Sequence, residues 1–153
     1  MQSGAEPVIV LMVDDDDADV YSAKRAFREG KIVNDFRHVS DADGLFDYLD
    51  RMSDGPGSAP YPRPHVILLD INMPGLSGLE VLKTLKQNEL YRSIPVVVLT
   101  TSDEEHDVSE SYALGASSYI TKPVSVEGMM NMAQRFEEYW FQMVRIPKGD
   151  LSK

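Results

Sequence analysis

Residues 66–70 place a wholly apolar run, Val-Ile-Leu-Leu, directly before an aspartate. An apolar run of this length, bounded by turn-forming residues, predicts a strand that is buried on both faces, as in a parallel sheet. Asn72, Pro74 and Gly75 follow and predict a tight turn. Asp70 is therefore expected where the strand ends, which in open α/β sheets is the edge that binds ligands. An ordinary aspartate that opens a turn is the alternative, and this segment alone does not decide between them.

The same arrangement recurs along the chain, with apolar or β-branched runs that predict strands and amphipathic stretches that predict helices. Strands are predicted at residues 8–13, 36–39, 66–69, 96–99 and 118–121, and helices at 18–28, after a cap at Ser40, at 78–88, at 103–115 and from 125 to about 145. This alternation predicts βαβ units with right-handed crossovers. The expected fold is α/β, a flavodoxin-like doubly wound (βα)5 fold with a parallel sheet in the order 2-1-3-4-5 and an extended C-terminal helix.

Length and composition narrow the class of protein. A chain of 153 residues suits one domain, with a core at about residues 7–146 and short tails at both ends. The formal net charge of -10 argues against nucleic acid or an anionic membrane as a partner. Cysteine is absent, which excludes disulfides and thiol chemistry. The first residues do not resemble a signal peptide and no apolar run reaches transmembrane length, so the expected location is the cytoplasm.

A run of acidic residues follows the first predicted strand. One or two of these acids can cap the next helix and complement its dipole. Asp14 and Asp15, however, precede that helix, and in the expected strand order they meet Asp70 at adjacent strand ends. Thr100 then comes from the next strand and Lys122 from the one after. Three carboxylates this close cannot all stay ionised without a positive partner.

A divalent cation bound through oxygen ligands suits this cluster. Mg2+ fits because it uses few carboxylates and keeps waters for phosphate oxygens. A carboxylate in such a site can act as a nucleophile toward phosphorus and form an aspartyl phosphate. The metal and Lys122 would offset charge on the transferred oxygens, and Thr100 can donate a hydrogen bond to one of them. Asp70 needs no general base, since it is anionic at neutral pH.

Short motifs stand at each of these strand ends. They are Val-Asp-Asp at 13–15, the stretch LDINMPGLSG at 69–78, Val-Leu-Thr-Thr at 98–101 and the stretch GASSYITKP at 115–123. In order and spacing they resemble the receiver domains of two-component response regulators, over nearly the whole chain. The resemblance implies a phosphoprotein of phosphorelay signal transduction rather than an enzyme, with slow self-dephosphorylation. It also implies a sensor histidine kinase or a phosphotransfer protein as partner.

The resemblance assigns roles around the acidic cluster. It implies that Asp70 is the phosphoacceptor. It implies that Asp15, Asp70 and the backbone carbonyl of Asn72 bind Mg2+, for which Mn2+ or Ca2+ can substitute. Asp14 would act on the metal mainly through water.

A second group of roles also follows from the resemblance. Thr100 and Tyr119 would form a switch pair, in which Thr100 moves to the phosphoryl group and Tyr119 turns inward. Thr101 and Lys122 belong to the same phosphoryl-binding set. The peptide between Lys122 and Pro123 is expected to be cis, which would point the lysine into the site.

A closer resemblance covers the ends of the chain. The acidic run at 14–19, the stretch 95–102 and the segment 136–140 resemble single-domain regulators that pair with phytochrome-type kinases. Members of that subgroup often carry proline where this chain has Asp17, a departure that touches no expected ligand.

The last predicted helix has an apolar arc of roughly 200°, wider than the stripe of about 100° that a surface helix needs. Core packing explains about half of these residues. The excess predicts a homodimer surface that includes Phe136, Trp140, Phe141 and Val144, together with the polar, loosely held helix at 103–115. The subgroup resemblance implies the same. Because only a short tail follows, output is expected through protein–protein contact or through phosphate relay.

Three other functions would also suit an α/β fold of this kind. A haloacid-dehalogenase-type phosphatase also uses an aspartate nucleophile with Mg2+, but it needs an acid where this chain has Asn72. A flavin-binding electron carrier on the same fold would place phosphate beside Asp14, which repels it. An acidic interaction domain with a decayed site is disfavoured because every expected site residue is present.

Overall fold

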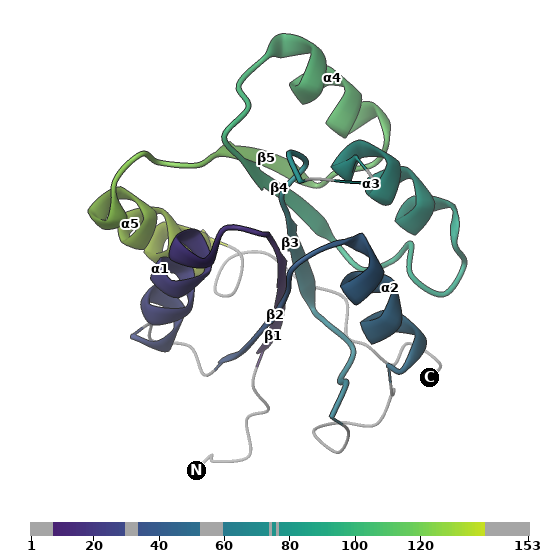
Figure 1. The fold of residues 1–153 in the computed structure, drawn as a ribbon, viewed down its shortest axis with the longest axis horizontal. Helices are drawn as coiled ribbons and strands as arrows, with labels where there is room; N and C mark the ends of the chain where they lie inside the picture. The colour runs from purple at the N-terminus through teal and green to yellow at the C-terminus, as the bar shows by residue number, and fades with distance from the viewer. Residues whose placement is uncertain (1–7, 30–33, 53–59, 74, 76, 140–153) are drawn as a thin grey trace.

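The computed structural model describes residues 8–29, 34–52, 60–73, 75 and 77–139. Within this part of the chain a five-stranded parallel sheet runs through the centre of the molecule (Figure 1). The strands are β1 (Val8–Val13), β2 (Asn34–Val39), β3 (Val66–Leu69), β4 (Val96–Thr100) and β5 (Ser118–Thr121). Their order is β2-β1-β3-β4-β5, and every neighbouring pair is parallel. The predicted fold class and strand order are confirmed.

Four helices of the described ranges connect the strands, and a fifth follows β5: α1 (Asp17–Arg28), α2 (Ala42–Asp50), α3 (Gly78–Gln87), α4 (Glu105–Ala113) and α5 (Val126–Glu137). Figure 1 shows α1 and α5 side by side on one face of the sheet, and α2 and α3 on the other. α4 contacts β5 and α3. None of the helices in the described ranges is long and apolar enough to span a membrane.

The central strands β1, β3 and β4 are buried on both faces, which explains their apolar runs. Alternate residues of each central strand point to opposite sides. One face packs against α2 and α3 through Leu11, Val13, Ile67, Leu69, Val96 and Val98. The other face packs against α1 and α5 through Val10, Met12, Val66, Leu68, Val97 and Leu99.

Aspartate side chains cap the first turns of α1 and α2. The Asp16 carboxylate accepts hydrogen bonds from the backbone N–H groups of Ala18 and Asp19, so part of the acidic run does have the capping role expected from the sequence. The prediction that Ser40 caps α2 is wrong. Asp41 caps this helix, because its carboxylate accepts from the Gly44 N–H at 2.8 Å.

Several expectations fall partly outside the described residues. The C-terminal helix is described as far as Glu137, so its predicted extension to about residue 145 stays a prediction. Trp140, Phe141 and Val144 of the predicted dimer surface also lie outside this part. The expectation of one domain over residues 1–153 is untested for the same reason.

Candidate functional site

Two aspartates stand one residue beyond the ends of adjacent central strands. The Asp14 N–H donates to the carbonyl of Val39 at 3.1 Å, and the Asp70 N–H donates to the carbonyl of Val13 at 3.0 Å. The hydrogen-bond ladder thus continues one residue past β1 and past β3. It fixes both aspartates side by side at the carboxyl edge of the sheet, where doubly wound folds bind their ligands.

The carboxylates of Asp14, Asp15 and Asp70 form a cluster in which one oxygen from each lies within 4.8 Å of the others. Asp14 and Asp70 are buried, at 1% and 5% exposure, whereas Asp15 is exposed. Burial raises the pKa of Asp14 above its ordinary value, although contacts with Lys122 and with the Asp16 N–H oppose this. The structure therefore brings together the three carboxylates that the strand order placed at one edge.

Lys122 supplies the positive charge of the cluster. Its Nζ lies 2.7 Å from Asp14 Oδ2, 2.9 Å from Asp19 Oδ2 and 3.1 Å from Asp70 Oδ2, and its side chain is buried. Burial lowers the pKa of Lys122, but its contacts with Asp14 and Asp19 outweigh burial and raise the pKa above its ordinary value. The lysine is therefore a fixed cation at neutral pH.

Sequence reasoning did not place Asp19 in this cluster. Asp19 lies in the first turn of α1, where an acid is expected to complement the helix dipole. The cap of α1 is already supplied by Asp16. That surplus of acids over the needs of one cap is the signal that could have pointed to a second role.

The Asp70 carboxylate is held at both oxygens. Oδ1 accepts from the backbone N–H of Asn72 at 2.9 Å, and Oδ2 accepts from Lys122. The Asn72 side-chain amide donates to Thr100 Oγ1 at 3.2 Å and to Thr101 Oγ1 at 3.5 Å. Thr100 is fully buried at the end of β4. Asn72 thus joins the Asp70 carboxylate to the hydroxyls of Thr100 and Thr101.

Tyr119 belongs to β5 and lies at the side of this cluster. Its hydroxyl donates to the backbone carbonyl of Ser102 at 2.7 Å, and its ring packs against the core between the sheet and the helices α2 and α3. Burial raises the pKa of its phenol, so the side chain is neutral at physiological pH. No hydrogen bond joins Tyr119 to Thr100 in the described residues.

The peptide between Lys122 and Pro123 is trans, since the described residues include no cis peptide bond. The predicted cis bond is therefore wrong. Lys122 reaches the site without it because its backbone N–H donates to the carbonyl of Thr100 at 2.6 Å, which continues the β4–β5 ladder beyond Thr121. A trans bond is also the more stable form for most X–Pro pairs.

The donor set fits a divalent metal. It consists of carboxylate oxygens alone, which magnesium, manganese and calcium prefer. Asp14 Oδ2 is buried, lies 2.7 Å from the Lys122 ammonium and has no hydrogen-bond partner in the described part of the chain. The exposed Asp15 leaves an open side for water and for a transferred oxygen. An ion here would offset the excess of negative charge that one lysine does not balance.

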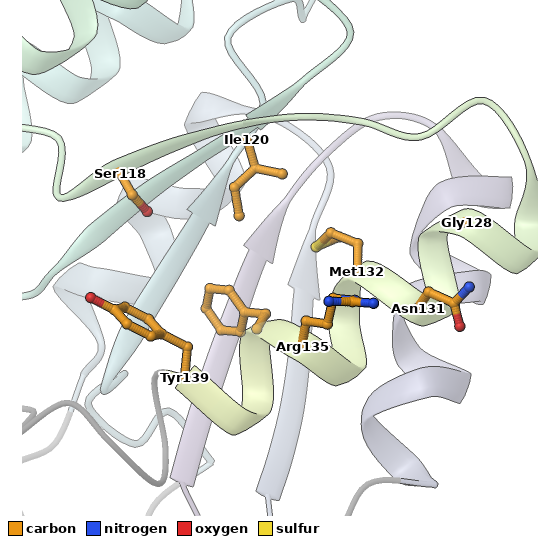
Figure 2. Close-up of a pocket in the computed structure, with 8 residues that line it drawn as sticks. Ser118, Ile120, Gly128, Asn131, Met132, Arg135 and Tyr139 are labelled. Atoms are coloured by element: carbon orange, nitrogen blue, oxygen red, sulfur yellow. The ribbon is translucent and has the colours of Figure 1, made fainter.

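A cavity of about 520 Å3 lies between β5 and α5, separate from the carboxylate cluster. Figure 2 shows Ser118 and Ile120 of β5 on one side, with Met132 and Arg135 of α5 and the following Tyr139 on the other. Phe136 also lines it but is 5% exposed, because its ring packs edge-on against Phe27 at 5.8 Å. Phe136 of the predicted dimer surface is therefore largely buried within its own chain, and its part in a dimer stays a prediction.

The geometry agrees with what comparison of the sequence shows. The family model of the response regulator receiver domain matches residues 10–134. The chain belongs to this family. Receiver domains are signalling domains of two-component systems rather than classical enzymes, and they receive phosphoryl groups from histidine kinases.

Relatives of this receiver domain match it over most of its length. The probable methanogenesis regulatory protein FilR2 of Methanothrix harundinacea is 35% identical over 142 residues, which are 93% of this chain and 89% of that protein. The response regulator Rcp1 of Synechocystis is 36% identical over 141 residues, which are 92% and 94%.

Solved structures extend the comparison. The Mn(2+)-bound form of Rcp1 has a TM-score of 0.81 at 35% identity, covering 92% of this receiver domain and 99% of that chain. The phosphorylated cyanobacterial phytochrome response regulator RcpA has a TM-score of 0.83 at 32% identity, with the same coverage. This receiver domain thus resembles phytochrome-associated response regulators.

Proposed function

We propose that this receiver domain accepts a phosphoryl group on Asp70 from a sensor histidine kinase or a phosphotransfer protein. The observation that carries the proposal is the buried Asp70 carboxylate, which is held by Lys122 and by the Asn72 N–H at a strand end beside Asp14 and Asp15. A phytochrome-type kinase is the partner that the similarity to RcpA favours. Output then passes to another protein by contact or by onward transfer of the phosphoryl group.

The residues around Asp70 suit an in-line transfer. An Asp70 carboxylate oxygen forms the new bond to phosphorus as the P–N bond of the donor's phosphohistidine breaks. The imidazole keeps the electron pair of that bond and takes up a proton from water. Lys122 offsets negative charge on the phosphoryl oxygens. Thr100 accepts a hydrogen bond from Asn72 through its oxygen, which leaves its O–H to donate to a phosphoryl oxygen.

A divalent cation completes the proposed site. Asp14, Asp15, Asp70 and the backbone carbonyl of Asn72 would hold it, and Mg2+ is the ion that we infer, with Mn2+ or Ca2+ as substitutes. The all-oxygen donor set and the Mn(2+)-bound form of Rcp1 support this inference. When bound, such an ion offsets charge on the transferred oxygens.

Phosphorylation would act by a population shift. A phosphoryl group on Asp70 draws Thr100 toward it, and Thr101 and Tyr119 respond at the ends of β4 and β5. α4 supports this role because Ser111 is its only buried residue, so it can move at little cost in packing. A homodimer through α4 and the C-terminal segment, including Trp140, Phe141 and Val144, remains part of the proposal.

Labelling with acetyl phosphate tests the proposed function. We expect the protein to acquire one acid-stable, hydroxylamine-sensitive acyl phosphate when Mg2+ is present, and to acquire none in Asp70→Asn. Asp17→Asn serves as the matched control, because it removes an exposed carboxylate of the same acidic run that is not in the cluster. Label retained by Asp70→Asn, or rapid turnover of phosphate monoesters without a labelled protein, would favour a phosphatase and end this proposal.

A further inference from the structure

Asp19 is the third carboxylate on Lys122, and the transfer described above gives it no role. It reaches the lysine from α1, an element that carries neither Asp14 nor Asp70. Its Oδ2 lies 2.9 Å from Lys122 Nζ, as close as the oxygens of the two strand-end aspartates. Its carboxylate is not needed for capping, because Asp16 caps α1 and accepts from the backbone N–H of Asp19.

Three carboxylates surround the Lys122 ammonium. An ammonium carries three N–H groups, and here three carboxylate oxygens lie within 3.1 Å of it. A phosphoryl oxygen on Asp70 that approaches Lys122 therefore competes with the carboxylate oxygens already around the ammonium. The carboxylate that is displaced from the lysine is the one whose release costs least free energy.

Exposure distinguishes the three partners of Lys122. The Asp14 side chain is 1% exposed, so releasing it would leave a buried charge without its lysine. Asp70 itself carries the phosphoryl group. The Asp19 side chain is 26% exposed, so water can replace the lysine at its oxygen. Release of Asp19 is the least costly of the three.

We propose that Asp19 is a positioning residue that holds the Lys122 ammonium until Asp70 is phosphorylated and then yields its place to a phosphoryl oxygen. No covalent bond changes in this exchange, and the ammonium keeps its protons. The inference rests on the proposed function, because it requires a phosphoryl group at Asp70. Its consequence is that Asp19 opposes phosphorylation by competing for the lysine.

Beryllofluoride, a mimic of the phosphoryl group, provides the probe. Its dissociation constant is measured by titration calorimetry at saturating Mg2+ and an ionic strength of about 0.15 M, where exposed charges are largely screened. The proteins compared are the unsubstituted chain, Asp19→Asn and the matched control Asp17→Asn. Asp17 lies on the same turn of α1 but makes no ion pair in the described residues. Circular dichroism verifies that each variant is folded.

We expect Asp19→Asn to bind beryllofluoride roughly two- to fivefold more tightly, the range of an ion pair with one partner partly in water. Asp17→Asn should bind like the unsubstituted chain. If Asp19→Asn binds beryllofluoride no more tightly than Asp17→Asn does, the proposal that Asp19 competes for Lys122 is overturned. If the unsubstituted chain does not bind beryllofluoride at all, the proposed function itself fails.

Adding Lys122→Gln separates competition for the lysine from plain charge repulsion. If Asp19 acts through the lysine, its substitution has no effect on beryllofluoride affinity in the Lys122→Gln background. A persistent gain in that background shows repulsion instead and overturns the role as a positioning residue. Where Lys122→Gln binds too weakly to measure, the comparison with Asp17→Asn decides alone.

Discussion

Gly78 lies so close to the strand end of Asp70 that no side chain fits there. A Cβ at this position would stand 2.2 Å from Ile71 Cα and 2.8 Å from the carbonyl oxygen of Asp70. Both neighbours are backbone atoms, which cannot rotate away. The first residue of α3 is thus packed directly against the backbone of Asp70 and Ile71.

Replacing Gly78 by alanine should therefore disturb both stability and the site. We expect Gly78→Ala to lower the free energy of unfolding by about 1–3 kcal/mol, as overpacking does, and to weaken Mg2+ binding. Urea denaturation and a metal titration measure the two effects. Gly44→Ala is the control, since its Cβ would meet only side-chain atoms, at 3.2 and 3.3 Å. If both variants lose the same small amount of unfolding free energy, the close approach of Gly78 to the backbone of Asp70 and Ile71 is contradicted.

Tyr48 predicts a dependence of stability on alkaline pH. Burial raises the pKa of its phenol to about 12, and its hydroxyl donates to the carbonyl of Pro62 at 2.6 Å. In the unfolded chain this phenol ionises near pH 10. The contribution of the neutral Tyr48 to the free energy of unfolding is therefore fully present below pH 10 and is lost as the pH rises from 10 to 12. At pH 11 we expect a loss of about 1.4 kcal/mol. Urea unfolding at pH 9 and at pH 11 measures the difference in the free energy of unfolding. This difference should be larger in the unsubstituted chain than in Tyr48→Phe by the contribution of Tyr48.

The sequence predicts which site residues stand at strand ends better than it predicts what they touch. Asp14, Asp70 and Thr100 are placed by apolar runs and strand order, which the sheet reproduces. The contact between Asp19 and Lys122 depends on how α1 packs over the sheet, and no local spacing reveals it. The cis bond between Lys122 and Pro123 is implied by the family resemblance alone, and the peptide in this structure is trans.

At the scale of the elements, α4 is held more weakly than its neighbours. Its N-cap is Glu104, whose side chain makes no capping hydrogen bond, whereas Ser125 caps α5 by accepting from the Gly128 N–H at 2.9 Å. The sequence predicted this weakness from the polar composition of residues 103–115. It could not place the Ser40–Asp41 boundary, because both residue types are good caps and one residue separates them.

A better cap should therefore tighten α4. We expect Glu104→Ser to stabilise the helix by about 0.5–1 kcal/mol and to slow amide hydrogen exchange of its residues. Ser125→Ala supplies the opposite comparison and should destabilise α5 by about 1 kcal/mol. Exchange in α4 that does not change in Glu104→Ser would show that the missing cap is not what loosens this helix.

For the whole molecule, the open question is assembly. A homodimer is expected from the apolar surplus of the C-terminal segment, although Phe136 packs inside its own chain. We predict a dimer at micromolar concentration in light scattering with beryllofluoride and Mg2+. Trp140→Ala should shift the equilibrium toward monomers. A monomer both with and without beryllofluoride would remove the dimer from the proposed function.

The site draws its residues from segments that are far apart along the chain. Asp14 and Asp19 come from the beginning, Asp70 from the middle, and Lys122 from the last strand. A nascent chain on the ribosome therefore has no neutralised acceptor until most of its length has been translated. If Asp70 accepts phosphate as proposed, we expect chains truncated before Lys122 to remain uncharged, so that only chains translated beyond this lysine can report the signal.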